Sequence, residues 1–192
     1  MKTKSYNDLI IFFKKHNLYE EKMFNYIRNN SIIFDYKDDE TRKKIGCYKV
    51  VQNNSLSSIT IVTPIIEDER TLIININIYM QAILAYQNLG YIYNPTEEQQ
   101  INDSAIAMLY ENIYLLENSS EVAKKYIDKL NQNIINSNDE KYKIALNIQE
   151  KLIENYLKKK NKNQNLINSS KKILKRSKQK ENKDTVILKL CK

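Results

Sequence analysis

The chain has 192 residues, of which 42% are hydrophobic, so it is long and apolar enough to form one domain with a buried core. Two glycines and two prolines favour long helices over a turn-rich β fold, and they exclude the glycine-rich loops that hold nucleotide phosphates. The net charge of +8 is uneven, because residues 151–192 hold 14 Lys or Arg against 3 Asp or Glu, while the residues before them are slightly acidic.

The cysteines and the apolar runs predict where the protein functions. Cys47 and Cys191 are far apart and form no CxxC pair, which is typical of free thiols in a reducing compartment. The sequence shows no signal peptide and no apolar run long enough to span a bilayer. We therefore expect a cytoplasmic protein without a membrane span.

The first third of the chain predicts two short helices followed by a small sheet. Apolar residues recur at helical spacing in residues 5–15 and 19–29. Three runs rich in β-branched and aromatic residues then predict an antiparallel sheet, and these runs are residues 31–36, 47–52 and 58–66. An Asn-Asn pair at 53–54 is the predicted turn, and Pro64 indicates that the last strand ends there or lies at an edge.

The segment around residues 70–79 allows two interpretations. Residues 74–78 alternate apolar and polar side chains, which locally favours a strand, whereas residues 79–89 have helical spacing and precede Gly90, a typical helix stop. The whole run is long for one strand. We therefore predict a largely buried helix from about Glu69 to Leu89.

Three further helices are predicted in the second half of the chain. Pro95 and Thr96 open the first, which has acidic residues in its first turn. Ser119-Ser120 precedes the second, and residues 136–138 separate it from the third, with which it would form a helical hairpin. From about Lys158 the apolar pattern gives way to Lys, Asn, Ser and Gln.

These elements predict the fold class and the domain organisation. We expect an α+β fold that is predominantly helical, with a small antiparallel sheet followed by a helical bundle. A single globular domain should occupy residues 1–157, and residues 158–192 should form a basic, partly disordered tail.

Most kinds of active site are excluded by the inventory of reactive side chains. His16 is the only histidine and has no partner motif nearby, which argues against Ser-His-Asp and Cys-His nucleophilic sites. One histidine and two scattered cysteines also leave no zinc site of the usual ligand types.

Five carboxylates lie along the helix predicted after Pro95, and they leave two interpretations open. They are Glu97, Glu98, Asp103, Glu111 and Glu117. Residues three or four apart share a helix face, so some of them could hold magnesium, or all could form the solvated side of an amphipathic helix. Tyr110 and Tyr114 flank Glu111, which predicts either a carboxylate–phenol network or plain core packing.

One series of short segments resembles a known family. The segments are Ile45-Gly46-Cys47-Tyr48, a strand ending at Pro64-Ile65, a helix through Tyr79, and Met108-Leu109-Tyr110-Glu111 followed by Tyr114 and Glu117. Over roughly residues 31–120 this order resembles small bacterial zincin-like proteins, which carry an HExxH metallopeptidase motif on a helix that follows a strand. The resemblance implies a zincin-like fold in which the next helix supplies a glutamate ligand to zinc.

The positions that correspond to the zinc site are altered in this chain. Asn77 and Gln81 stand where the resemblance places the two zinc-binding histidines. Ile78 stands at the general-base position and Ser104 near the third ligand, and Glu111 completes the altered site. Because these amides and hydroxyls are poor zinc ligands, we expect no catalytic residue, metal or cofactor. Asn77 and Gln81 should hydrogen-bond across one helical turn, unless they are the polar edge of a half-buried element.

We therefore expect a non-catalytic zincin-like scaffold or interaction protein, a pseudo-metallopeptidase, with another protein as its partner. A second hypothesis is sequence-independent binding of nucleic acid or another anionic surface by the basic tail. Its basic residues are Lys158, Lys159, Lys160, Lys162, Lys171, Lys172, Lys175, Arg176, Lys178 and Lys180. No aromatic residue follows Tyr156, so bases cannot stack on this tail. A third hypothesis, an enzyme built on the carboxylates of residues 97–117, would make Glu111 essential for activity.

Overall fold

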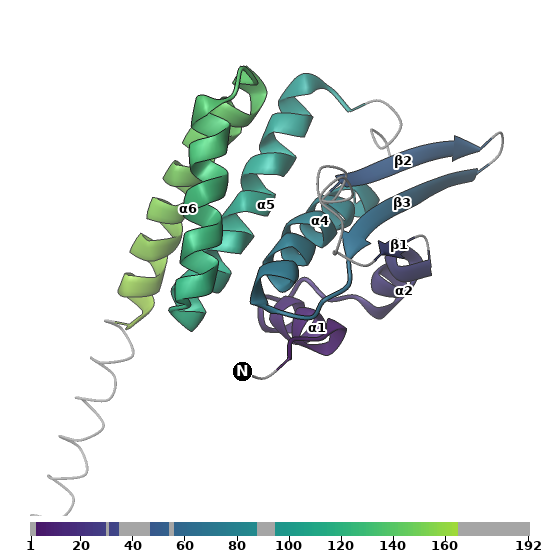
Figure 1. Ribbon diagram of the computed structural model, residues 1–192, viewed down its shortest axis with the longest axis horizontal. Helices are drawn as coiled ribbons and strands as arrows, with labels where there is room; N and C mark the ends of the chain where they lie inside the picture. Colours follow the sequence, from purple (N-terminus) through teal and green to yellow (C-terminus); the bar gives the residue numbers. More distant parts are fainter. Residues whose placement is uncertain (1–2, 30, 35–46, 54–55, 88–94, 165–192) are drawn as a thin grey trace, which may run out of the picture. The chain divides into compact units, whose positions relative to one another are not determined.

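The computed structural model describes five segments of the chain, which are residues 3–29, 31–34, 47–53, 56–87 and 95–164 (Figure 1). The described residues are predominantly helical, as the composition predicts. Contacts divide the chain into two compact units, Met1–Leu152 and Ile153–Lys192, and the candidate site lies in the first. None of the described helices is both long and apolar enough to cross a membrane.

The two N-terminal helices form where the apolar periodicity predicts them. They are α1 (Tyr6–Lys15) and α2 (Glu21–Asn29). The backbone N–H of Ser5, the N-cap of α1, donates to Oδ2 of Asp8 at 2.7 Å. The buried side chains of the two helices are Leu9, Phe12, Phe13, Met23, Phe24 and Ile27. Both helices pack against α4 (Glu69–Gln87) and so cover part of its surface.

The sheet contains the three predicted strands, but it is mixed and not antiparallel throughout. The strands are β1 (Ser31–Phe34), β2 (Cys47–Asn53) and β3 (Leu56–Pro64), in the order β1-β3-β2. β2 and β3 form the predicted antiparallel hairpin, whereas β1 pairs with β3 in parallel, with Ser31 opposite Ile61. The prediction was wrong for β1 because its partner is distant in the sequence and no local turn sets its direction. Pro64 predicted either the end of its strand or an edge position in the sheet. β3 ends at Pro64 and is the central strand, so only the predicted strand end is confirmed.

The ambiguous segment is a helix, since α4 runs through the middle of the first unit. It contacts β3, α1, α2, α5 and α6 and is buried on almost every side. A helix enclosed in this way has no polar face, so its sequence can alternate like a strand. Asn75 is tolerated there because its Nδ2 donates to the carbonyl oxygens of Thr71 (2.9 Å) and Pro64 (3.0 Å), which ties α4 to the end of β3. The predicted stop at Gly90 lies outside the described residues.

Three helices of the second half lie side by side, as Figure 1 shows. They are α5 (Glu97–Asn118), α6 (Glu121–Asn136) and residues 140–152, which are the first-unit part of a helix that runs over residues 140–164. Thr96 caps α5 by accepting the backbone N–H of Gln99 at 3.2 Å, and Ser120 caps α6 by accepting that of Ala123 at 3.1 Å. One apolar cluster joins all three helices, and its buried members are Ala105, Met108, Ile134, Ala145 and Leu146.

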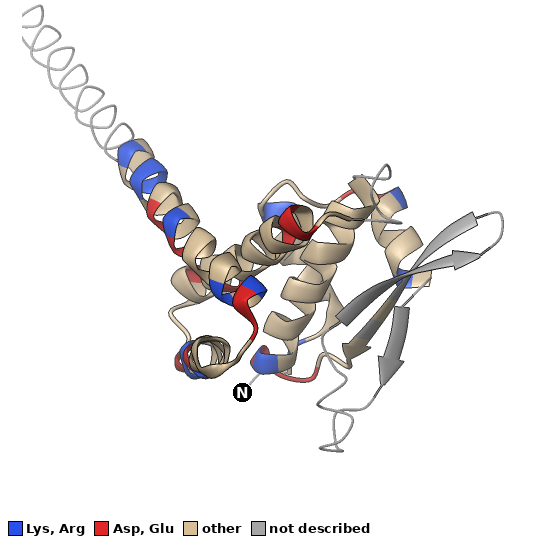
Figure 2. Ribbon diagram, turned by 90° about the horizontal axis from the view of Figure 1, so that it is seen from above, with Lys and Arg blue, Asp and Glu red and all other residues tan. Residues whose placement is uncertain are grey.

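The last helix continues past residue 157, where the globular domain was predicted to end. Lys158, Lys159, Lys160 and Lys162 are exposed on it, and Nζ of Lys158 lies 3.6 Å from Oε2 of Glu154. Figure 2 shows basic residues along its last described turns. The remaining predicted tail residues, Lys171 to Lys180, and the disorder predicted for them lie outside the described part of the chain.

Candidate functional site

One pocket brings together all the positions that the zincin resemblance singles out. Its volume is about 430 Å³, and it lies where α4, α5 and α6 meet. The singled-out residues that line it are Asn77, Ile78, Gln81, Ser104 and Glu111. The first three come from α4 and the other two from α5, so two helices bring these residues to the same pocket.

A chain of hydrogen bonds connects the two amides of α4 to the carboxyl group of α5. Nε2 of Gln81 donates to Oδ1 of Asn77 at 2.6 Å, which confirms the predicted bond across one helical turn. Asn77 also hydrogen-bonds the carboxyl of Glu111. Because this hydrogen bond lowers the pKa of the carboxyl, it stabilises the carboxylate, and Asn77 is therefore the donor through its Nδ2. The two amides that stand at the histidine positions are therefore bound to each other, and Asn77 also binds the carboxyl of Glu111.

Burial makes Glu111 an unusually weak acid. The residue is only 2% exposed. Burial raises the pKa of its carboxyl to about 8, and the hydrogen bond from Asn77 acts in the opposite direction. At neutral pH the group is therefore mostly protonated, so it can both donate and accept a hydrogen bond, and it carries little charge for holding a cation.

The rest of the pocket lining contains both apolar and polar side chains. Ile74, Met108, Leu130 and Ile134 supply the apolar wall. Arg70, Tyr126, Asn133 and Tyr142 are further lining residues that sequence reasoning missed as site residues. A signal for them existed, because Arg70 is one helical turn from Ile74 and two turns from Asn77, on the same face of α4.

The five carboxylates along α5 do not form one site. Glu97 and Glu98 are exposed, whereas Asp103 and Glu111 are buried. At the end of the helix, Oε2 of Glu117 accepts from Nζ of Lys15 at 2.8 Å and lies 3.3 Å from Nε2 of His16. Across the described segments, no three His, Cys, Asp or Glu side chains are placed to hold a metal ion.

Tyr114 takes part in a carboxylate–phenol hydrogen bond, but its partner is Glu69 and not Glu111, around which the sequence suggested such a network. The hydroxyl of Tyr114 donates to Oε1 of Glu69 at 2.8 Å, and Oγ of Ser120 donates to the other oxygen of Glu69. Tyr110 packs its ring against Phe12 and His16. This network joins the start of α4 to the end of α5 and the start of α6, and it lies apart from the hydrogen bonds of Glu111.

The chain was compared with family models, with curated proteins and with solved structures, and none of them matches it. The zincin-like interpretation therefore depends on the residues of the chain and on their placement around the pocket.

Proposed function

We propose that this protein is a non-catalytic interaction protein of zincin-like type, a pseudo-metallopeptidase whose altered site recognises a partner by hydrogen bonds. The observation that carries the proposal is the convergence of Asn77, Gln81, Ser104 and Glu111 on one pocket. Asn77 and Gln81 lie one turn apart on α4, Ser104 and Glu111 lie two turns apart on α5, and the packing of the two helices brings these faces to one pocket. Their meeting supports the correspondence with a zinc site whose ligands have been replaced.

The chemistry of the replaced side chains supports a binding role over hydrolysis. Zinc in proteins is held by thiolate, imidazole or carboxylate donors, and peptide hydrolysis needs a base to activate the metal-bound water. The side chain of Ile78 cannot accept a proton. The amides of Asn77 and Gln81 are engaged with each other, and Glu111 is mostly neutral at pH 7 because of its burial. What remains is a set of hydrogen-bond donors and acceptors in an apolar cavity, which suits recognition.

The first test is the metal content of protein purified without a histidine tag, together with a peptidase assay on the same sample. We expect no stoichiometric zinc and no hydrolysis. Stoichiometric zinc in the wild-type protein, or peptide cleavage that a chelator stops, would overturn the proposal.

A gain-of-function variant tests the zincin correspondence itself. The double substitution Asn77→His with Gln81→His restores two imidazoles four residues apart, with Glu111 in the same pocket as a third donor. We expect this variant to bind zinc at least about tenfold more tightly than a control pair, Lys124→His with Asp128→His, on an exposed part of α6. Equal zinc affinity of the two variants would reject the correspondence.

An alternative function is binding of nucleic acid or another anionic surface by the basic segment from Lys158. The observation that favours it is the exposure of Lys158, Lys159, Lys160 and Lys162 on one helix. A fluorescence titration with a single-stranded oligonucleotide at several salt concentrations would test it, because binding through phosphate contacts weakens steeply with salt.

A further inference from the structure

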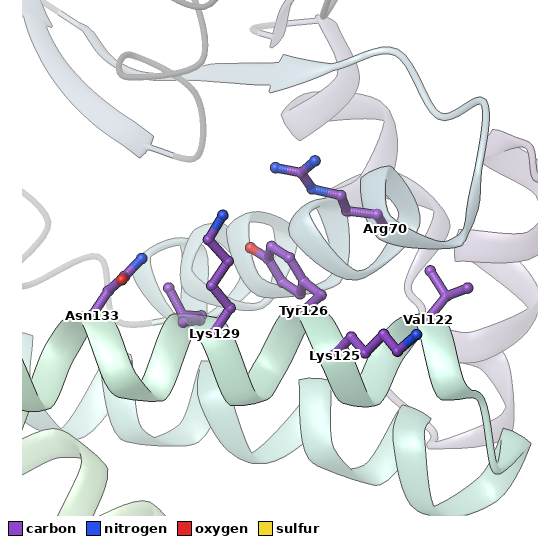
Figure 3. A pocket seen from close by; sticks show the side chains of 7 residues that line it. Arg70, Val122, Lys125, Tyr126, Lys129 and Asn133 are labelled. Atoms are coloured by element: carbon purple, nitrogen blue, oxygen red, sulfur yellow. The ribbon is translucent and has the colours of Figure 1, made fainter.

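A second hollow opens beside the altered site, on the surface of α6. It is a groove of about 660 Å³. Figure 3 shows Arg70 from α4 and Tyr126 and Lys129 from α6 directed into the same space, while Lys125 lies along α6 toward Val122. The guanidinium carbon of Arg70 lies 5.8 Å from the centre of the Tyr126 ring, which holds this arginine over the floor of the groove.

The charge of the groove has one sign among the residues that line it. Three cationic side chains line it, and those of Arg70 and Lys129 are directed into it while that of Lys125 lies along α6; no acidic side chain in the described part of the chain lines it. Glu121 and Asp128 lie nearby on α6, are exposed, and are not part of the lining. Two lysines and an arginine around one hollow favour an anionic group there, and a dianion more than a monoanion.

The groove adjoins the pocket of the altered site. Arg70, Tyr126, Leu130 and Asn133 line both hollows. A molecule with its anionic end in the groove would therefore extend past Asn133 into a space lined by the Asn77–Gln81 pair and Glu111. That inner space offers uncharged donors and acceptors between apolar walls, and its volume of about 430 Å³ is in the range of sites for small molecules.

We propose that the groove and the pocket together form a binding site for a small phosphate monoester. The phosphate group lies between Lys129 and Arg70, whose ammonium and guanidinium groups donate to its oxygens, and Lys125 adds positive charge along the same groove. The uncharged polar body of the ligand lies in the pocket and exchanges hydrogen bonds with Asn133, Ser104 and the carboxyl of Glu111.

Two features of the site distinguish this ligand from other anions. A polynucleotide would follow the exposed lysines along the surface and could not enter the pocket, which is lined by residues of four helices. A purely apolar acid would leave the carboxyl of Glu111, which is 2% exposed, facing a ligand that offers it no hydrogen bond. The proposal depends on the groove and the pocket alone and would stand if the zincin correspondence were rejected.

The experiment is calorimetric titration of the full chain, at constant ionic strength, with inorganic phosphate, ribose 5-phosphate and ribose. We expect saturable binding of inorganic phosphate, binding of ribose 5-phosphate at least about tenfold more tightly, and no measurable binding of ribose. If inorganic phosphate shows no saturable binding, the anion site does not exist. If ribose 5-phosphate binds no more tightly than inorganic phosphate, the pocket does not receive the body of the ligand.

Matched variants locate the binding on the molecule. Lys129→Ala should weaken phosphate binding about tenfold, because it removes a charge-assisted hydrogen bond. The control Lys124→Ala removes the same charge from an exposed position of α6 outside the groove and should change affinity less than about twofold. Both residues are exposed, and alanine favours helix, so both variants should fold.

Two further outcomes would overturn the proposal. If Lys129→Ala and Lys124→Ala lose phosphate affinity equally, phosphate binds through the net charge of the protein and not in the groove. A single-stranded oligonucleotide that displaces ribose 5-phosphate and binds more tightly than it would identify the groove as part of a nucleic-acid surface.

Discussion

The middle and the end of α5 carry the same acidic side chain in opposite environments. Glu111 lies in the middle, where burial raises the pKa of its carboxyl to about 8 although Asn77 donates a hydrogen bond to it. Glu117, at the end, is also partly buried, but hydrogen bonds and charges from Lys15 and His16 outweigh burial and lower its pKa. The middle of α5 therefore presents a neutral donor to a pocket, whereas its end holds an anion that ties α1 to α5.

The difference shows how a polar residue can be assigned to binding or to structure. At Glu117 the protein itself supplies the partners, so the group is satisfied by the fold. At Glu111 the protein supplies an amide from Asn77, and the carboxyl otherwise faces a cavity. A buried polar group that faces a cavity is where a ligand gains most from hydrogen bonds.

The largest expected effect is on the pH dependence of stability, through Glu111→Gln. Between its ordinary pKa of 4.5 and its folded value of about 8, the folded carboxyl binds more protons than the unfolded one. Stability therefore falls as the pH rises through this window, by on the order of 1 kcal/mol per pH unit. Glutamine does not titrate, so the variant should lack this fall and be more stable than the wild type above pH about 8.

Urea unfolding of both proteins, at intervals across that pH window, would measure the difference. If the free energies of unfolding of the two proteins change with pH in parallel, the pKa of Glu111 is not raised, and the contrast between its pKa and that of Glu117 does not exist. The same titration with Glu117→Gln is the matched control on the same helix.

The next effect concerns the amide that supports the carboxyl. Asn77→Ala removes the hydrogen bond that lowers the pKa of Glu111 and also the acceptor of Gln81, so the pKa should rise further. The free energy of unfolding should fall by about 1–2 kcal/mol. Carbon-13 NMR of the glutamate carboxyl would follow the pKa, with Asn112→Ala as control, because Nδ2 of Asn112 donates to the carbonyl of Met108 and not to Glu111.

A smaller effect of opposite sign is expected at Glu117. Its pKa is lowered in the folded protein, so its contribution is present above its ordinary pKa of 4.5 and is lost as the pH falls through the folded value. Glu117→Gln should destabilise the protein at neutral pH by about 0.5–1 kcal/mol, since Lys15 is 59% exposed and solvent screens the pair. Thermal unfolding at low and high salt would test this, and a loss that does not depend on salt would contradict the ion-pair explanation.

The smallest effect on stability is expected from the exposed lysines of the last helix. Replacing Lys158, Lys159, Lys160 and Lys162 by glutamine should change the free energy of unfolding by less than about 0.5 kcal/mol, because these side chains are solvated. The same variant should bind a single-stranded oligonucleotide with a reduced salt dependence if the basic segment contacts phosphates. An unchanged salt dependence would remove the alternative function from consideration.

Much of the fold could be predicted because the signals are local. Apolar spacing and capping residues mark α1, α2, α5 and α6. The Asn-Asn pair at 53–54 predicts the antiparallel hairpin, although Asn53 is the last residue of β2 and Asn54 lies outside the described residues. The parallel pairing of β1 with β3 could not be predicted, since it joins residues about 30 positions apart without a local turn. Asn77, Gln81 and Glu111 could be selected in advance only because a resemblance supplied their register, and Arg70 was missed because an arginine near a helix start is usually a solvated charge.

The sequence by itself determined the helical character, the uneven charge and the absence of the usual zinc ligands, because each of these depends on residue type and spacing along the chain. Tertiary structure alone decided that α4 is enclosed, that the pKa of Glu111 is raised and that of Glu117 lowered, and that the groove of α6 shares four lining residues with the pocket of the altered site. The reason is physical: a pKa, a burial and a cavity depend on which distant side chains surround a group, and one residue's place in the sequence does not specify its neighbours in space.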